Sequence, residues 1–201
     1  MFITIILFLC YPLLVHLAVV CEEPILLAAA IVALATGILL VKLKALSLSA
    51  WLLWLGICLT AIILNIFDIA LYALYMPPII LPLLLCYVFG STLLPGRTPL
   101  VTDIGQKARG PLGDKMNRYT LRVTQLWCLF FLLSALFSCC LAVFASDQFW
   151  SLYTNVISYL LTGVLFVGEF IYRQIIFDQH DHPNFIDYVK IVVRSQVNKP
   201  R

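Results

Sequence analysis

Four charged residues near the ends of apolar segments are the first candidates for chemistry: Arg97, Arg122, Glu169 and Arg173. A carboxylate inside an apolar segment is costly unless it is paired or reaches water, so Glu169 is the most informative of them. Arg173 follows Glu169 by four residues, which is the favourable order for an ion pair on a helix. Arg122 is a second candidate partner. Three interpretations stay open: an ion pair at a helix end, a contact to a lipid headgroup or substrate, and a proton relay.

Arg97 lies in a segment rich in proline and glycine, residues 90–100. Its guanidinium and the backbone amides around it could hold a phosphate or a lipid headgroup. The segment matches neither a Walker loop nor a dinucleotide-binding fingerprint, because both of these follow a β-strand. The alternative is a rigid turn that fixes the helices on either side of it.

Other polar groups favour structural roles. Asn155 lies within an apolar segment, where a side-chain amide is expected to hydrogen-bond between helices. The run 178–182 packs four potential metal ligands into five residues, but the spacing is not a recognised one, and a solvated loop is favoured. No Ser-His-Asp, Cys-His, H-E-x-x-H or paired-carboxylate pattern is present. The sequence therefore assigns no catalytic residue, metal or cofactor, which favours a non-enzymatic role.

The elements that hold these residues are predicted to be membrane helices. Hydrophobic residues make up 63% of the chain and charged residues 11%, whereas soluble domains average about 45–50% and about 25%. A crossing needs roughly 20 residues, so 201 residues suit one all-α transmembrane bundle of about six helices, a single membrane domain over residues 1–201. The predicted helices cover about 2–20, 25–41, 48–66, 70–89, 123–145 and 150–172, with a loop over 90–122 that could contain one short surface helix and a tail over 173–201.

The fourth predicted helix contains Pro77, Pro78 and Pro82. Proline lacks the backbone N–H and clashes with the preceding turn, so this segment must be kinked or interrupted. Neighbouring helices, hydroxyl groups or water would have to satisfy the carbonyls that are released. Whether the segment spans fully or forms a re-entrant pair with residues 48–66 stays open.

The charges predict the orientation of the bundle. All thirteen Lys and Arg residues fall in the second or fourth segment between predicted helices or in the tail. The charged residues in the other segments between helices are all acidic. Short cytoplasmic loops keep Lys and Arg, so both termini and the loop 90–122 are predicted to be cytoplasmic. The same distribution argues against nucleic acid as a partner, because the cations do not share one soluble face.

The tail beyond Pro183 has apolar residues at helical spacing, including Phe185, Ile186 and Val189, with Asp187 and Lys190 opposite. This pattern predicts a C-terminal amphipathic helix at the membrane interface, with its cations near anionic lipid headgroups. The alternative is a helix packed under the bundle.

A set of short motifs is spread over residues 75–190: Pro77-Pro78, Phe89-Gly90, Leu94-Pro95-Gly96-Arg97-Thr98-Pro99-Leu100, Tyr119-Thr120, Val123-Thr124, Trp127, Phe130-Phe131, Trp150-Ser151-Leu152, Asn155, Tyr159, Phe166, Glu169, Tyr172-Arg173, His182-Pro183 and Phe185. This set resembles a family of bacterial inner-membrane proteins encoded near fatty-acid or aryl polyene synthase genes, some of which carry the label ketosynthase. A weaker likeness is to the intracellular septation protein A family.

The first resemblance implies a location in the bacterial inner membrane and an accessory role in acyl-chain or polyene lipid synthesis at its cytoplasmic face. Membrane lipids would be partners, as would an acidic acyl carrier protein or synthase subunits that meet the basic segment between Arg97 and Arg122. A lipid-handling transporter or enzyme is an alternative, and the second resemblance implies an envelope or division scaffold. The ketosynthase label does not fit, since a ketosynthase resembles a soluble thiolase fold with a nucleophilic cysteine and two histidines.

Overall fold

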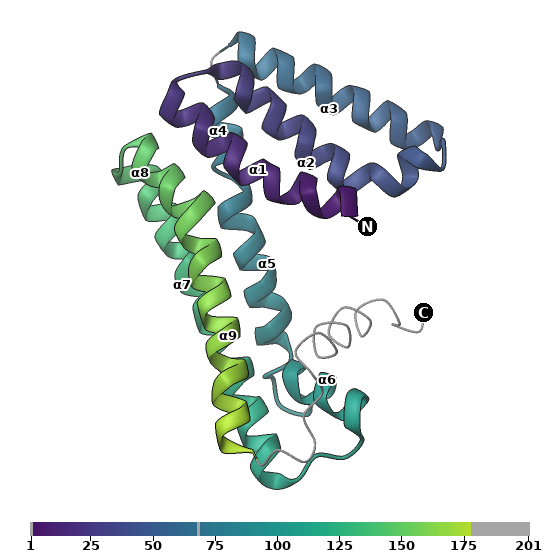
Figure 1. Ribbon diagram of the computed structural model, residues 1–201, viewed down its shortest axis with the longest axis vertical. Coiled ribbons are helices and arrows are strands. Elements are labelled where there is room, and N and C mark those ends of the chain that lie inside the picture. The colour runs from purple at the N-terminus through teal and green to yellow at the C-terminus, as the bar shows by residue number, and fades with distance from the viewer. Residues whose placement is uncertain (1, 68, 178–201) are drawn as a thin grey trace. The chain divides into compact units, whose positions relative to one another are not determined.

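The computed structural model describes residues 2–67 and 69–177, and this part of the chain contains helices and no strand (Figure 1). The prediction of an all-α chain is confirmed. In chain order the helices are α1 (Phe2–Cys21), α2 (Pro24–Lys44), α3 (Leu48–Ile66), α4 (Ala70–Leu74), α5 (Pro77–Ser91), α6 (Leu100–Arg109), α7 (Asp114–Phe144), α8 (Asp147–Leu152), the π-helical turn η1 (Tyr153–Ile157) and α9 (Ser158–Ile176).

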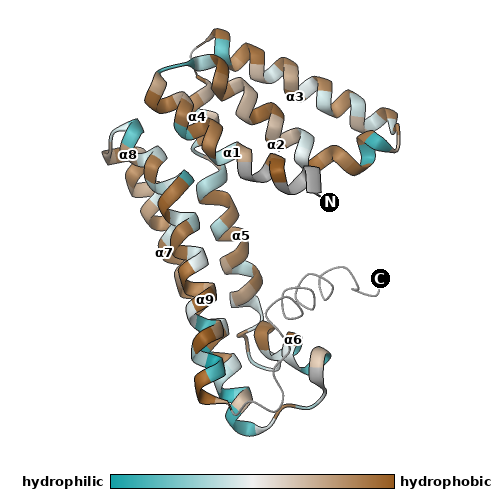
Figure 2. Cartoon of the chain, in the orientation of Figure 1, coloured by the Kyte–Doolittle hydropathy of each residue, from teal (hydrophilic) through white to brown (hydrophobic). Residues whose placement is uncertain are grey.

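Five helical segments in the described residues are long and apolar enough to cross a membrane, which is compatible with a membrane protein. They are Pro24–Lys44, Leu48–Ile66, Ala70–Ser91, Asp114–Phe144 and Asp147–Ile176. A further apolar stretch, Cys10–Cys21 in α1, is shorter. Figure 2 shows apolar residues along these helices, with polar residues gathered near helix ends and on α6.

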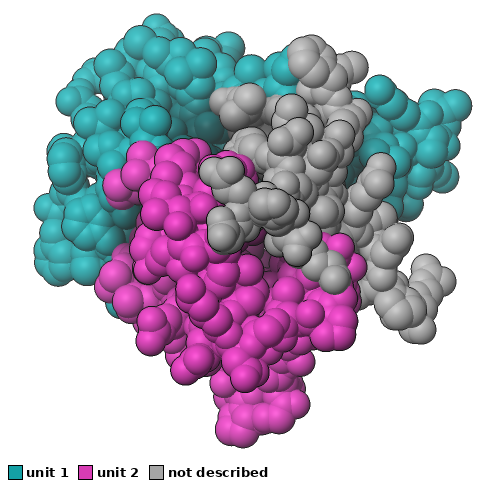
Figure 3. Space-filling view, turned by 60° about the horizontal axis from the view of Figure 1, so that its bottom comes forward, with its two compact units in different colours: residues 1–80, 136–160 teal, residues 81–135, 161–201 magenta. Residues whose placement is uncertain are grey.

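The chain divides into two compact units, where the sequence predicts one bundle (Figure 3). Unit 1 comprises residues 1–80 and 136–160, and unit 2 comprises residues 81–135 and 161–201. Each unit therefore draws on two separate stretches of the chain. The boundaries fall inside α5, α7 and α9, so these three helices contribute residues to both units.

Unit 1 is built on the hairpins α1–α2 and α2–α3 and closed by α4, α8 and η1. Its core joins Tyr11 and Val15 of α1 to Leu74 of α4 and Trp150 of α8. Trp150 is completely buried, and its ring meets the Tyr75 ring edge-on, with 4.3 Å between centroids. Aromatic pairs prefer this geometry, so the contact fixes α8 against the end of α4.

The proline-containing segment is interrupted, as its composition predicts. α4 ends at Leu74 and α5 begins at Pro77. Pro77 and Pro78 occupy the first turn of α5, where the missing N–H groups would have no intrahelical partner in any case. Pro82 lies inside α5 and removes one hydrogen bond there.

Unit 2 is organised around the aromatic face of α7. Val123, Trp127 and Phe131 form its buried core, against which Phe89 of α5 and Phe166 of α9 pack. The rings of Phe89 and Phe131 meet edge-on at 5.5 Å. One further link joins α5 to α7, because the thiol sulfurs of Cys86 and Cys128 lie 3.7 Å apart.

Threonine side chains fix α6 to this core. The Leu100 N–H donates to Thr92 Oγ1 over 3.0 Å, and the Val101 N–H donates to Thr124 Oγ1 over 3.3 Å. The first N–H groups of a helix lack intrahelical acceptors, so these hydroxyls cap α6. Thr102 and Thr120 add a hydroxyl-to-hydroxyl hydrogen bond of 2.6 Å between α6 and α7.

The predicted loop over 90–122 is wrong in its second half. α7 begins at Asp114 rather than near residue 123, directly after Gly110, Pro111 and Gly113 have ended α6. Hydropathy marks only the apolar part of a helix, whereas backbone hydrogen bonding continues into polar sequence. α9 likewise continues to Ile176, past the predicted end at 172. The predicted amphipathic helix of the tail lies outside the described residues.

Candidate functional site: a basic and apolar groove

The early start of α7 places three cations on one face of a helix. Lys115, Arg118 and Arg122 follow one another at intervals of three and four residues. Residues at these spacings share a helix face, and the same face continues through Tyr119 into apolar Leu126. The result is a stripe that is basic at the start of α7 and apolar one to two turns later.

The second wall of the site is the last three turns of α9. The ring of Tyr119 stacks on the ring of Tyr172, with 6.0 Å between centroids and 21° between planes. The Lys115 ammonium lies 5.4 Å from the centroid of the Phe177 ring, just beyond the end of α9. Since 115 pairs with 177 and 119 with 172, the two helices run antiparallel here.

A groove of about 750 Å³ lies along this pair of helices. Its polar end is lined by Lys115, Arg118, Tyr119, Arg122, Glu169 and Tyr172. Its other end is lined by Val123 and Leu126 of α7 and by Val164 and Leu165 of α9. Gly168 also lines the groove, and a Cβ atom added to it would meet no other heavy atom within 4 Å. A pocket of this size with a few convergent polar groups is the default hypothesis for a ligand site.

Charge decides which ligands suit the groove. Three cations and one carboxylate line it, so it favours an anion. Arginine offers a planar fork of donors that matches phosphate and carboxylate groups. Inside a bilayer the apolar end adds little affinity, because lipid tails are as apolar as the side chains. Affinity for an amphiphile must then come from the charged end, while the apolar end selects by shape.

Glu169 is the most buried charged group in the groove, with 8% of its surface exposed. The Tyr119 hydroxyl donates to its Oε1 over 2.9 Å and lies 3.3 Å from its backbone carbonyl oxygen. The i, i+4 spacing predicts an ion pair with Arg173, but the structure gives this carboxylate a tyrosine partner from α7 instead. Arg173 is buried, with its guanidinium carbon 5.5 Å from the centroid of the Phe170 ring, and it does not line the groove.

Arg97 lies apart from the groove. Its Nη1 donates to the carbonyl of Ser91, the last residue of α5, over 3.1 Å. A cation that binds the final carbonyls of a helix complements the helix dipole. Gly96 precedes it with φ 80°, a conformation that glycine adopts without strain. This geometry corresponds to the rigid turn that the sequence left open beside an anion site.

Asn155 lies in unit 1, inside the π-helical turn η1. Its amide donates within its own helical segment, to the Ser151 carbonyl over 3.1 Å and toward the hydroxyls of Ser151 and Thr154. The hydrogen bond between helices is formed by Ser151, which Asn155 contacts: Ser151 Oγ lies 3.2 Å from His16 Nδ1 of α1. Asn155 thus supports the interhelical bond without forming it.

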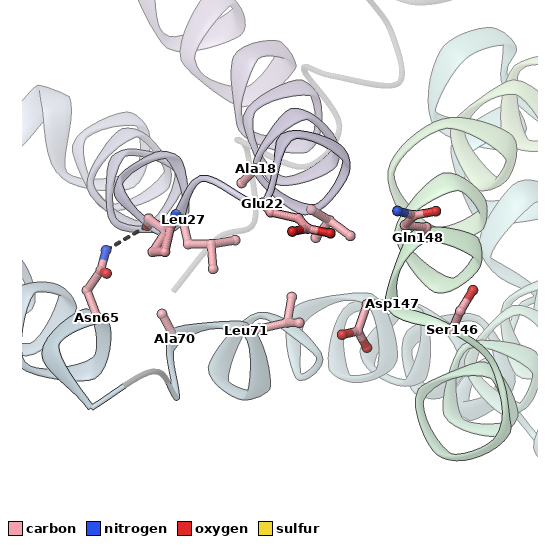
Figure 4. Close-up of a pocket in the computed structure, with 11 residues that line it drawn as sticks. Ala18, Glu22, Leu27, Asn65, Ala70, Leu71, Ser146, Asp147 and Gln148 are labelled. Carbon is pink, nitrogen blue, oxygen red and sulfur yellow. Dashed lines mark hydrogen bonds between the residues drawn. The ribbon is translucent and has the colours of Figure 1, made fainter.

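Unit 1 has a smaller pocket of about 470 Å³, in which Glu22 lies on one side and Leu71 and Asp147 lie on the other (Figure 4). Two of its polar side chains, Asn65 and Asp147, already have structural partners. The Asn65 amide donates to the Pro24 carbonyl over 2.6 Å, and the Tyr75 hydroxyl donates to Asp147 Oδ1 over 2.5 Å. These bonds tie helix ends together, so the groove of unit 2 is the stronger candidate site.

Of the residues singled out from sequence, the groove contains Arg122 and Glu169, while Arg97 and Arg173 lie outside it. The sequence interpretation missed Lys115, Arg118 and Tyr119, because it placed them in a loop. Their helical spacing after Gly113 and Asp114 is the signal that could have identified them. No three His, Cys, Asp or Glu residues gather as metal ligands in residues 2–67 and 69–177, and the run 178–182 lies outside these ranges. No protein-family model, curated protein or solved structure matches the chain.

Proposed function

We propose that the chain is a multi-pass protein of a bacterial inner membrane, crossing it six times with both termini in the cytoplasm. The five apolar helical segments and the apolar stretch in α1 supply the crossings. The partition of all Lys and Arg residues supports the orientation, since cytoplasmic loops retain these residues.

This topology predicts the behaviour of reporter fusions. A periplasm-dependent phosphatase joined after Gly110 is expected to be inactive, because that position follows an even number of crossings. The same reporter joined after Asp147 is expected to be active. Enzyme activity normalised to fusion protein abundance measures both, and the opposite pattern would contradict the orientation.

Within this topology, the groove between α7 and α9 binds a lipid that has an acyl chain and an anionic head. The observation that carries the proposal is the order of residues along the groove, from Lys115 and Arg118 to Leu126 and Val164. This order matches a headgroup at the cytoplasmic surface with its chain directed into the bilayer. Clusters of Lys and Arg at that surface attract anionic headgroups, by about 1 kcal/mol for each residue.

The protein thus serves as an accessory to acyl-chain or polyene lipid synthesis by holding a lipid-linked intermediate or product. The groove supports binding rather than turnover: its arginines and tyrosines are recognition groups, and its one carboxylate is hydrogen-bonded to Tyr119. The resemblance of residues 75–190 to membrane proteins encoded near such synthases supports the same role. Exposed Lys115 and Arg118 also suit an acidic carrier protein that delivers or collects the chain.

Two arginine substitutions test this binding function. We expect Arg122→Ala to weaken the binding of an anionic single-chain lipid about tenfold, because it removes a charge-assisted hydrogen bond. Arg97→Ala is the matched control, since Arg97 is an exposed arginine of the same unit that contacts Ser91 and does not line the groove. Affinity would be measured for the purified full chain in phosphatidylcholine nanodiscs.

The expected result also depends on salt, because the cations that line the groove are exposed and their attraction is screened. Equal affinities of wild type, Arg122→Ala and Arg97→Ala at low salt would argue against the groove as the binding site. A loss in Arg97→Ala alone would move the site to the turn between α5 and α6.

A further inference from the structure

Glu169 poses a question that an anion-binding groove does not answer. The residue is 92% buried among groove residues, yet its negative charge opposes an anionic ligand. An ionised carboxylate offers about four acceptor positions. Among the described residues only the Tyr119 hydroxyl donates to it, at Oε1, which leaves Oε2 for another donor.

The position of Glu169 along the groove determines which part of a ligand it meets. Tyr119 contacts both Glu169 and Tyr172, so the carboxylate lies farther from the cytoplasmic end than Arg118. It also lies before the apolar end formed by Leu126 and Val164. Arg122 follows Tyr119 by three residues on α7, so it lines the groove at about the level of Glu169. The order along the groove is therefore the outer cations Lys115 and Arg118, then Glu169 together with Arg122, then the apolar end.

We infer that the ligand is a single-chain phospholipid with a free hydroxyl, of the lysophosphatidate type. This inference rests on the proposed function and names the ligand class for the same groove. The phosphate monoester meets Arg118 and Arg122, the glycerol hydroxyl donates to Glu169, and the acyl chain follows Leu126 and Val164. The apolar end has one wall from α7 and one from α9, which suits one chain.

Other lipid classes fit the same order less well. A fatty acid has an anionic head but no donor between the head and the chain. A two-chain phosphatidate has both glycerol hydroxyls esterified and likewise offers no donor to Glu169. An ethanolamine headgroup carries its ammonium outside the phosphate, where Lys115 and Arg118 would repel it. Among these classes, the lipid with a hydroxyl between its phosphate and its chain satisfies both the cations and the carboxylate.

The test compares two lipids that differ by one hydroxyl. The probes are 1-acylglycerol 3-phosphate and the acyl ester of propanediol phosphate, offered to the full chain in phosphatidylcholine nanodiscs. Wild type is expected to bind the hydroxyl lipid about tenfold more tightly, as for a hydrogen bond to a charged acceptor. Glu169→Gln should reduce this preference to about twofold or less. Asp103→Asn makes the same acid-to-amide change on α6, outside the groove, so it should keep the preference.

The possible outcomes distinguish failure of the inferred hydroxyl contact from failure of the proposed lipid-binding function. If wild type binds both lipids equally and Arg122→Ala weakens both, the hydroxyl inference is overturned and the anionic groove stands. If neither lipid binds wild type, the proposed function fails as well. If Glu169→Gln does not accumulate, the comparison of the two lipids on wild type still decides, because equal affinities for both overturn the inference.

Discussion

Replacing Gly168 with leucine is expected to lower the affinity for an anionic single-chain lipid about 10- to 100-fold. Gly168 lines the groove, and a Cβ built on it meets no heavy atom within 4 Å. The leucine is therefore accommodated on α9 and occupies space that the ligand needs. Forcing extra methylene groups into occupied space costs about 1–3 kcal/mol, which corresponds to this range of affinity.

Gly163 supplies the matched control. It lies on the same helix, is exposed, and likewise has open space around its Cβ, but it does not line the groove. Both substitutions raise helix propensity by up to about 1 kcal/mol, so their effects on the backbone are alike. Lipid binding by Gly163→Leu should match wild type. Equal binding by Gly168→Leu would show that the lipid occupies a different site.

The largest effect on stability is expected for Trp150→Ala, which should lower the free energy of unfolding by about 3 kcal/mol. Trp150 is fully buried, and the centroid of its ring lies 4.3 Å from that of the Tyr75 ring. Its indole N–H has no hydrogen-bond partner among the described residues, so the loss is one of packing. The alanine would leave a cavity where α4 and α8 meet in unit 1.

Phe149 is the control for this substitution, because it is the adjacent aromatic residue and 49% of its surface is exposed. Phe149→Ala should cost less than about 1 kcal/mol. Unfolding of both variants would be followed by circular dichroism during titration with a denaturing detergent. Similar losses of stability in the two variants would contradict the packing of α8 against α4.

The features of the fold that were predictable from sequence are those set by local chemistry. The apolar runs predicted the ends of α2 and α3 to within a few residues, and the proline pair predicted the interruption before Pro77. The start of α7 was not predictable from hydropathy, because a membrane helix can continue into water without any change in its backbone bonds. Lys115, Arg118 and Arg122 do have helical spacing. A search for apolar segments does not detect this spacing, because all three residues are charged.

The candidate site shows a second limit. Glu169 stood out because a carboxylate in an apolar run requires an explanation, and it does line the groove. An ion pair with Arg173, four residues away, was one of the interpretations left open, whereas the structure provides Tyr119, fifty residues away. Spacing along one helix does not determine which side chain bonds a carboxylate. Tertiary packing can bring a hydroxyl from a distant part of the chain closer to it than a cation four residues away. For Arg97, the sequence left open an anion site and a rigid turn, and local spacing could not choose between them, because the carbonyl that it contacts belongs to the end of α5.

The composition of the unit 1 core has a consequence for how the protein is made. Tyr11, Val15 and Leu74 pack with Leu141 and Trp150, yet Leu141 lies 67 residues after Leu74. At a translation rate of about 5–20 residues per second, the ribosome needs roughly 3 to 13 seconds to supply the missing residues. On the proposed topology, the first helices enter the membrane with an incomplete core, so insertion machinery or a membrane chaperone is expected to hold them until the later helices arrive.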